Sequence, residues 1–146
     1  MMNAPARPEY TVAVTQQASA PISPDVHSVL LRGTRSGKRG NKAEGAEAVS
    51  EYQQQGSHKA ANWLIDTNGE IFELAGWDRA AGDSRGEYVI YLAQPLPDDP
   101  LSQEQYHSLG WLMDRLTARK NIPRARGAYG YSSELGKIFD WSMVEL

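Results

Sequence analysis

Apolar and polar positions alternate along the chain in a way that predicts several short strands. Within residues 26–34, the apolar run Val29-Leu30-Leu31 predicts a buried strand that ends at a glycine-rich, basic loop. Two apolar segments, 61–66 and 70–74, flank the turn residues 67–69, which is typical of an antiparallel hairpin. Residues 87–93 are rich in β-branched and aromatic side chains and predict another buried strand.

Two segments have helical spacing instead. Residues 41–56 open with a capping-box pattern and continue with apolar residues every three or four positions. The second helix is predicted to begin after Ser102, which forms a capping box with Gln105, and to end near Asn121, just before Pro123.

The remaining elements complete an α/β pattern. Residues 127–131 predict a last strand, and residues 139–144 predict a short helix or turn. We therefore expect a single α/β domain with a central mixed β-sheet flanked by helices over residues 26–146. Residues 1–25 are rich in Pro, Ala, Ser and Gln, which favours an extended N-terminal arm.

The arm contains one short apolar stretch at residues 10–15. Its alternate side chains Tyr10, Val12 and Val14 are expected to pack on the edge of the protein's own sheet or on another subunit. We therefore expect a protein partner, or a second copy of the chain, to be bound through the arm.

Composition narrows the classes of function. The chain has 146 residues and a formal charge of -3, which does not favour nucleic acid or an anionic membrane as a partner. Cysteine is absent, which excludes disulfides, thiol nucleophiles and Cys-ligated zinc. No apolar run approaches the roughly 18 residues of a membrane helix, and the first residues lack the apolar core of an export signal. We therefore expect a cytoplasmic or virion-associated protein.

The loop after the first predicted core strand is basic. Gly33-Thr34-Arg35-Ser36-Gly37-Lys38 has three residues between its glycines where a phosphate loop has four, and Arg39 stands where a Ser or Thr should bind magnesium. A solvated basic loop is the better interpretation. Its positive patch, where an anionic ligand or an acidic partner would bind, consists of Arg35, Lys38, Arg39 and Lys42.

Histidine spacing gives no metal motif. His27, His58 and His107 do not pair at the spacing of zinc ligands, and no Gly-x-Ser-x-Gly nucleophile motif occurs. From the residues alone we expect no catalytic group, no metal and no cofactor.

Five segments, in order, carry a resemblance to a known family. They are the strand end 29–34, the hairpin 61–73, Gly76-Trp77-Asp78, the helix that opens at Ser102, and Gly130-Tyr131-Ser132. Over residues 26–145 the chain resembles the zinc-dependent type 2 N-acetylmuramoyl-L-alanine amidases and the peptidoglycan recognition proteins. Enzymes of this superfamily bind zinc with two His and one Cys or Asp.

The resemblance also implies that the zinc ligands are missing. Arg32 stands at the first ligand position and Tyr131 at the second, while residues 133–137 offer neither Cys nor Asp at the third. Ala61 replaces a Tyr that often assists catalysis. Because a guanidinium cannot be deprotonated to bind a metal, we expect a pseudoenzyme that serves as a binding or structural module.

The module has two predicted forms. It binds peptidoglycan fragments in the former substrate groove, or it serves in a larger assembly such as that of a bacteriophage. The candidate ligand-binding residues are Arg32, Asn62, Trp63, Trp77, Asp83, Tyr131 and Ser132. Core packing is the alternative for the two tryptophans.

The resemblance also predicts the surroundings of Arg32. Arg32 should lie at the floor of the groove beside Tyr131, with its charge held by Asp83 or Glu134 or by backbone carbonyls and a hydroxyl.

The alternative function is an active N-acetylmuramoyl-L-alanine amidase whose metal ligands lie elsewhere in the sequence.

Overall fold

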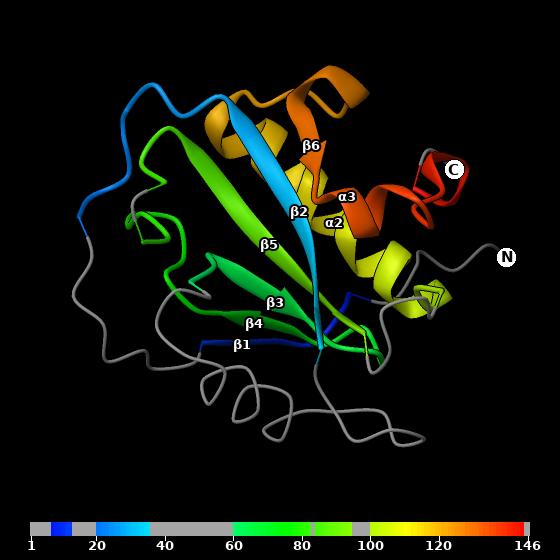
Figure 1. The fold of residues 1–146 in the computed structure, drawn as a ribbon. Coiled ribbons are helices and arrows are strands. Elements are labelled where there is room, and N and C mark those ends of the chain that lie inside the picture. Colours follow the sequence, from blue (N-terminus) through cyan, green and yellow to red (C-terminus); the bar gives the residue numbers. More distant parts are fainter. Residues whose placement is uncertain (1–6, 13–19, 36–59, 83, 95–99, 145–146) are drawn as a thin grey trace, which may run out of the picture.

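The computed structural model describes residues 7–12, 20–35, 60–82, 84–94 and 100–144 (Figure 1). These residues form a six-stranded sheet in the order β1-β4-β3-β5-β2-β6. The strands are β1 (Tyr10–Val12), β2 (Ser28–Arg35), β3 (Trp63–Ile65), β4 (Ile71–Glu73), β5 (Glu87–Gln94) and β6 (Tyr129–Tyr131). The helices are α2 (Gln103–Lys120) and α3 (Ser133–Gly136), with 3₁₀ turns η1 (Arg126–Ala128) and η2 (Trp141–Met143).

The sheet is mixed, as the sequence predicts. β3 and β4 pair antiparallel, whereas every other neighbouring pair is parallel. The hairpin turn is set locally, because Asp66 Oδ1 accepts the backbone N–H groups of Asn68 and Glu70, and Gly69 has a φ of 87°. The single α/β domain is therefore confirmed, while the helix expected at 41–56 lies outside the described residues.

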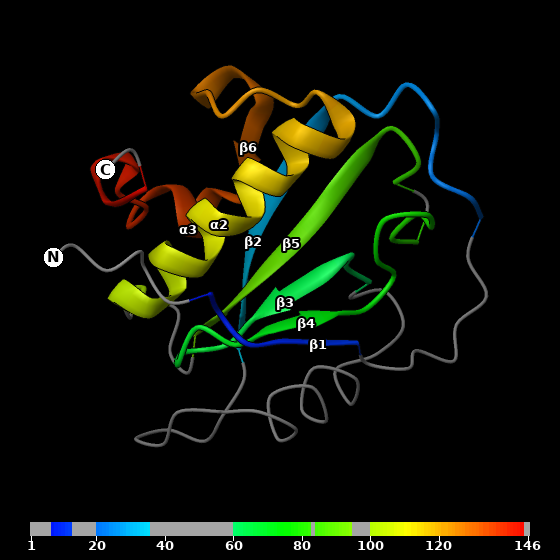
Figure 2. The same cartoon turned by 180° about the vertical axis from the view of Figure 1, so that it is seen from behind.

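Helix α2 packs along one face of the sheet (Figure 2). The predicted capping box is present: Ser102 Oγ accepts the Gln105 N–H and Gln105 Oε1 accepts the Ser102 N–H, each at 3.0 Å. Gln105 also donates to the carbonyls of Ala93 and Ile65 at 2.9 and 3.2 Å. Gln105 thus completes the cap of the helix and anchors the helix to β3 and β5.

The strands divide their side chains between two apolar layers, because successive residues of a strand point to opposite faces. The layer under α2 includes Leu31, Trp63, Ile90, Leu92, Leu109, Leu112 and Met113. The opposite layer includes Leu64, Phe72, Val89, Tyr91 and Ala93. This division decides on which face each candidate site residue lies.

The arm adds an edge strand to the protein's own sheet. β1 runs parallel to β4, with Tyr10 opposite Ile71, and the Ile71 N–H donates to the Glu9 carbonyl at 2.8 Å. Tyr10 packs against the core, whereas Val12 is 66% exposed and does not pack on the protein's own sheet. Val12 lies about 7 Å further along the strand than Tyr10, beyond the core side chains that Tyr10 contacts. Val14 lies outside the described residues.

No helix in the described part of the chain is long and apolar enough to cross a membrane.

Candidate functional site

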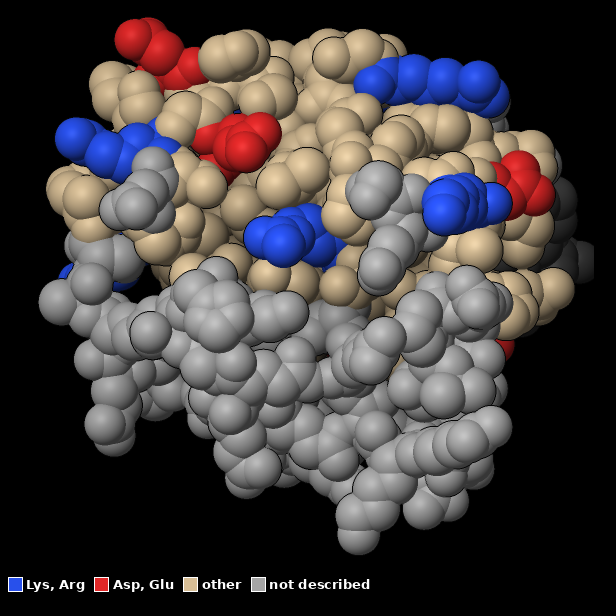
Figure 3. All heavy atoms as spheres, in the orientation of Figure 1, with Lys and Arg blue, Asp and Glu red and all other residues tan. Residues whose placement is uncertain are grey.

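Arg32 and Tyr91 lie side by side on the sheet face that is turned away from α2. β2 and β5 are parallel with Arg32 opposite Tyr91, so both side chains project from the same face. The Arg32 guanidinium carbon lies 5.5 Å from the centre of the Tyr91 ring, a cation–π distance. Figure 3 shows this face, where the basic and acidic side chains of the described residues are scattered among uncharged ones.

The two groups differ in charge. Burial raises the pKa of the Tyr91 phenol, which is 1% exposed, while the positive charge of Arg32 acts in the opposite direction. Tyr91 is therefore neutral at physiological pH and Arg32 is always cationic. The pair presents one half-buried cation with hydrogen-bond donors, which suits a carboxylate or another anion.

The expectation of a carboxylate partner for Arg32 is not met among the residues that the structure describes. The ion pair found there joins Arg124 and Asp114, whereas Arg32 contacts an aromatic ring. A ring face stabilises a half-buried guanidinium by its quadrupole, without a hydrogen bond. Asp83 and the side chain of Glu134 lie outside the described part.

Tyr131 does not lie beside Arg32. It is opposite Leu31 in the β2–β6 pairing, and Leu31 faces α2, so Tyr131 faces α2 as well. Its ring contacts Phe139 and Trp141, at centroid distances of 4.9 and 6.3 Å. The expected juxtaposition is wrong, because one residue along a strand reverses the face.

Ser132 is the residue of this segment that comes level with Arg32. Its N–H donates to the Leu31 carbonyl at 3.0 Å, which continues the parallel ladder one residue beyond Tyr131. Ser132 is half-buried. Of the two neighbouring candidates, Tyr131 and Ser132, it is Ser132 that lies on the sheet face that carries Arg32.

Asn62 is buried and has a structural role. Its amide donates to the carbonyls of Gly76 and Arg79 at 2.9 and 2.8 Å, and its Oδ1 accepts the Val89 N–H at 2.8 Å. These bonds fasten the loop after β4 to β5. We therefore withdraw Asn62 as a ligand-binding candidate, since its amide is occupied inside the protein.

The two tryptophans lie on the α2 side of the sheet. Trp63 is fully buried, its ring packs on Trp77 and Tyr88, and its indole N–H donates to the Tyr10 oxygen at 2.8 Å. Trp77 is half-buried, with the Arg119 guanidinium 4.1 Å from its ring centre. The packing alternative therefore describes both, and neither shares a face with Arg32.

The donor set does not fit zinc. A guanidinium is not a metal ligand, and the Tyr131 oxygen lies across the sheet from Arg32. No group of three His, Asp or Glu that could hold a metal occurs among the residues described. His27 lies in the loop before β2 and His107 on α2, while His58 lies outside the described part.

The basic patch cannot be placed in full. Arg35 is the last residue of β2, and its side chain lies outside the described part. Lys38, Arg39 and Lys42 also fall outside it.

Sequence reasoning missed Tyr91, the neighbour of Arg32. Its strand was predicted, but its face follows from the pairing with β2, which no local pattern specifies. The arginines stacked on Trp77 and Trp111 were missed as well. Their helical spacing was a usable signal, since Trp111, Arg115 and Arg119 follow one another at four-residue intervals.

Solved structures of peptidoglycan recognition proteins share this fold. Drosophila PGRP-SA matches with a TM-score of 0.66 and 14% identity, over 84% of this chain and 80% of that one. The ectodomain of the Drosophila transmembrane receptor PGRP-LCa matches with a TM-score of 0.63 and 15% identity, over 90% and 86% of the two chains. PGRP-LE in complex with tracheal cytotoxin, a monomeric diaminopimelic acid-type peptidoglycan, matches with a TM-score of 0.61 and 17% identity, over 75% and 70%.

Identities this low establish the fold alone. A search of curated proteins found no match. The family model of N-acetylmuramoyl-L-alanine amidase, however, matches residues 25–137, which is more than half of the chain and includes the strands that carry Arg32 and Tyr91. On this evidence the chain belongs to the N-acetylmuramoyl-L-alanine amidase family.

Proposed function

We propose that this chain binds peptidoglycan fragments on the sheet face that carries Arg32 and Tyr91, and does not hydrolyse them. The observation that carries the proposal is the place of Arg32. It stands where the family resemblance puts the first zinc ligand, and its guanidinium lies 5.5 Å from the Tyr91 ring centre. A permanent cation at this position disfavours a divalent metal and favours an anionic group of the ligand.

The chemistry of the ligand supports this choice. Peptidoglycan peptides carry carboxylates, and a guanidinium recognises a carboxylate through two parallel hydrogen bonds. The ring of Tyr91 limits the motion of the Arg32 side chain and leaves the in-plane N–H donors for the ligand. Ser132, which comes level with Arg32, would supply a hydroxyl beside them.

Binding is tested with tracheal cytotoxin, a defined peptidoglycan monomer, by titration calorimetry on the full chain. We expect Arg32→Gln to weaken binding about tenfold, since a charge-assisted hydrogen bond is lost. Arg79→Gln, which removes an exposed arginine with no role in this proposal, should bind like the wild type. Equal binding by wild type and Arg32→Gln would contradict the role of Arg32.

The absence of hydrolysis is tested separately. Protein purified without chelator should contain far less than one zinc per chain and should release no peptide from peptidoglycan. One zinc per chain, together with release of peptide, would establish the alternative of an active amidase. If the module serves instead in a bacteriophage assembly, the wild type will bind no peptidoglycan fragment at all.

A further inference from the structure

The exposed side of α2 carries opposite charges at its two ends. Glu104 lies in the first turn, and Arg115 and Arg119 lie in the last turns, with Trp111 between them. These residues are seven, four and four positions apart, so they form one stripe along the helix. Glu104, Arg115 and Arg119 are exposed, and Trp111 is half-buried. We call these four residues the α2 stripe.

The basic end is held in place by aromatic rings. The guanidinium carbon of Arg115 lies 4.8 Å from the Trp111 ring centre, and that of Arg119 lies 4.1 Å from the Trp77 ring centre. Within the described part of the chain, the ion pair that forms joins Arg124 to Asp114, so neither arginine of the stripe has a carboxylate within 4 Å. Both keep their charge and their in-plane donors for another molecule.

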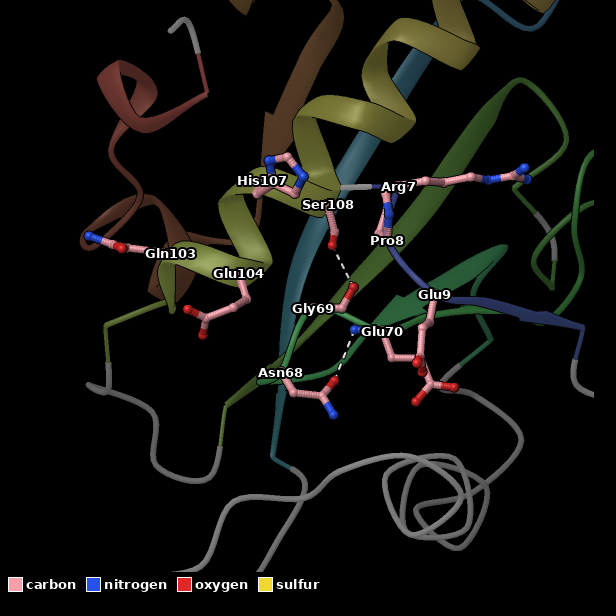
Figure 4. A pocket seen from close by; sticks show the side chains of 10 residues that line it. All are labelled: Arg7, Pro8, Glu9, Asn68, Gly69, Glu70, Gln103, Glu104, His107 and Ser108. Atoms are coloured by element: carbon pink, nitrogen blue, oxygen red, sulfur yellow. Dashed lines mark hydrogen bonds between the residues drawn. The ribbon is translucent and has the colours of Figure 1, made fainter. Parts of the chain in front are cut away.

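The acidic end borders an open pocket of about 460 Å³ (Figure 4). Glu104 lines it from α2, Glu70 from the hairpin turn and Glu9 from the arm. Ser108 Oγ donates to the Gly69 carbonyl at 2.5 Å, which holds the turn against the helix. Arg7 also lines the pocket, but its side chain is directed away from the carboxylates and its guanidinium lies 5.5 Å from the Trp111 ring centre.

We propose that two copies of the chain pair through their α2 stripes, antiparallel and about a two-fold axis near Trp111. In this arrangement Glu104 of each copy comes level with Arg119 of the other, since both lie about 11 Å from the midpoint of the stripe. Arg115 of the second copy comes level with Ser108 and therefore with the acidic pocket beside it. One surface thus complements itself, as a two-fold interface requires.

The order of the charges along the α2 stripe favours a second copy of the chain over an unrelated acidic protein as the binding partner. An acidic partner would be attracted by Arg115 and Arg119 but repelled by Glu104 and the pocket carboxylates at the other end. A second copy matches both ends at once. Trp111, at the centre, is the type of residue that dominates interface energetics together with arginine. The proposal is independent of the proposed ligand face, because the stripe lies on the opposite side of the sheet from Arg32.

The test is sedimentation velocity of the full chain over a concentration series. The wild type should dimerise reversibly, and Glu104→Arg or Arg119→Glu should each weaken the dimer about tenfold, since each places like charges at two symmetric contacts. An equimolar mixture of the two variants should associate at least as strongly as the wild type. In a mixed pair the introduced arginine of one chain meets the introduced glutamate of the other, and the unchanged Arg119 of the first meets the unchanged Glu104 of the second. Misfolding cannot produce this rescue.

Asp25→Arg is the matched control, since it changes the net charge as Glu104→Arg does but lies in an exposed loop before β2. It should dimerise like the wild type. A wild type that stays monomeric at every concentration, variants that dimerise unchanged, or a mixture that associates no better than its components would each overturn the proposal.

Discussion

The phenol of Tyr10 in the arm donates a hydrogen bond to the carboxylate of Glu73 in β4, with an oxygen–oxygen distance of 2.5 Å. The same phenol oxygen accepts the indole N–H of buried Trp63 at 2.8 Å. One side chain near the start of the chain therefore connects the edge strand to the core, and this explains why β1 pairs within its own chain.

We expect Tyr10→Phe to lower the free energy of unfolding by about 1–3 kcal/mol, because the Trp63 N–H and the Glu73 carboxylate both lose their partner. Urea denaturation followed by tryptophan fluorescence measures the change. Thr11→Ala removes a hydrogen bond between exposed groups on the same strand and should cost about 0.5 kcal/mol or less. Similar losses in the two variants would contradict the special place of Tyr10.

Removing residues 1–12 tests the division into arm and domain. We expect the shortened chain to stay folded, because the layer of apolar side chains under α2 is formed almost wholly by residues after 25. Its thermal midpoint should fall by at least about 5 °C, since β4 loses its parallel neighbour and Trp63 loses Tyr10. Differential scanning calorimetry gives the answer, and an unchanged midpoint would mean that the arm is incidental.

Designed histidines test the register of β2 and β6. Arg32→His with Ser132→His places two imidazoles at one level of neighbouring strands, which lie about 4.8 Å apart. Arg32→His with Tyr131→His places them on opposite faces. We expect the first pair to bind Zn²⁺ at least about tenfold more tightly by calorimetry. Equal or reversed affinities would show that the assignment of faces is wrong.

Asn62→Ala should lower the free energy of unfolding by about 2–4 kcal/mol, because two buried hydrogen bonds and one partly buried hydrogen bond each lose a partner. Asn68→Ala, in the exposed hairpin turn, is the matched control and should cost about 1 kcal/mol or less. Chemical denaturation of both variants compares them. A small effect at Asn62 would mean that the loop after β4 is held by other contacts.

Stability should fall at alkaline pH. Burial raises the pKa of Tyr88 to about 12, with Asp78 adding to the effect, and burial also raises the pKa of Tyr10 and Tyr129. The pKa of an unfolded tyrosine is about 10, so these phenols stabilise the fold fully below pH 10 and lose that contribution as the pH rises above it. The free energy of unfolding should drop by up to about 1.4 kcal/mol per pH unit for each such tyrosine. Urea titrations at pH 9, 10 and 11 measure this, and the slope should be smaller in Tyr88→Phe.

Local patterns were sufficient for the elements themselves. The hairpin depends on Asp66 and Gly69 within one turn, and α2 begins with a capping box formed by residues three positions apart. Such signals involve neighbours in the sequence, so they can be read without the fold. The same holds for the apolar runs of β2 and β5.

Tertiary structure alone decided which side chains meet. The pairing of β2 with β5 and β6 joins segments far apart in the sequence, and a shift of one residue in either pairing would exchange the faces of all its side chains. For this reason the sequence could name Arg32 and Tyr131 but could not tell that the sheet separates them. The partner that Arg32 has, Tyr91, follows only from register, which is determined by packing across the whole sheet and not by the residues beside it.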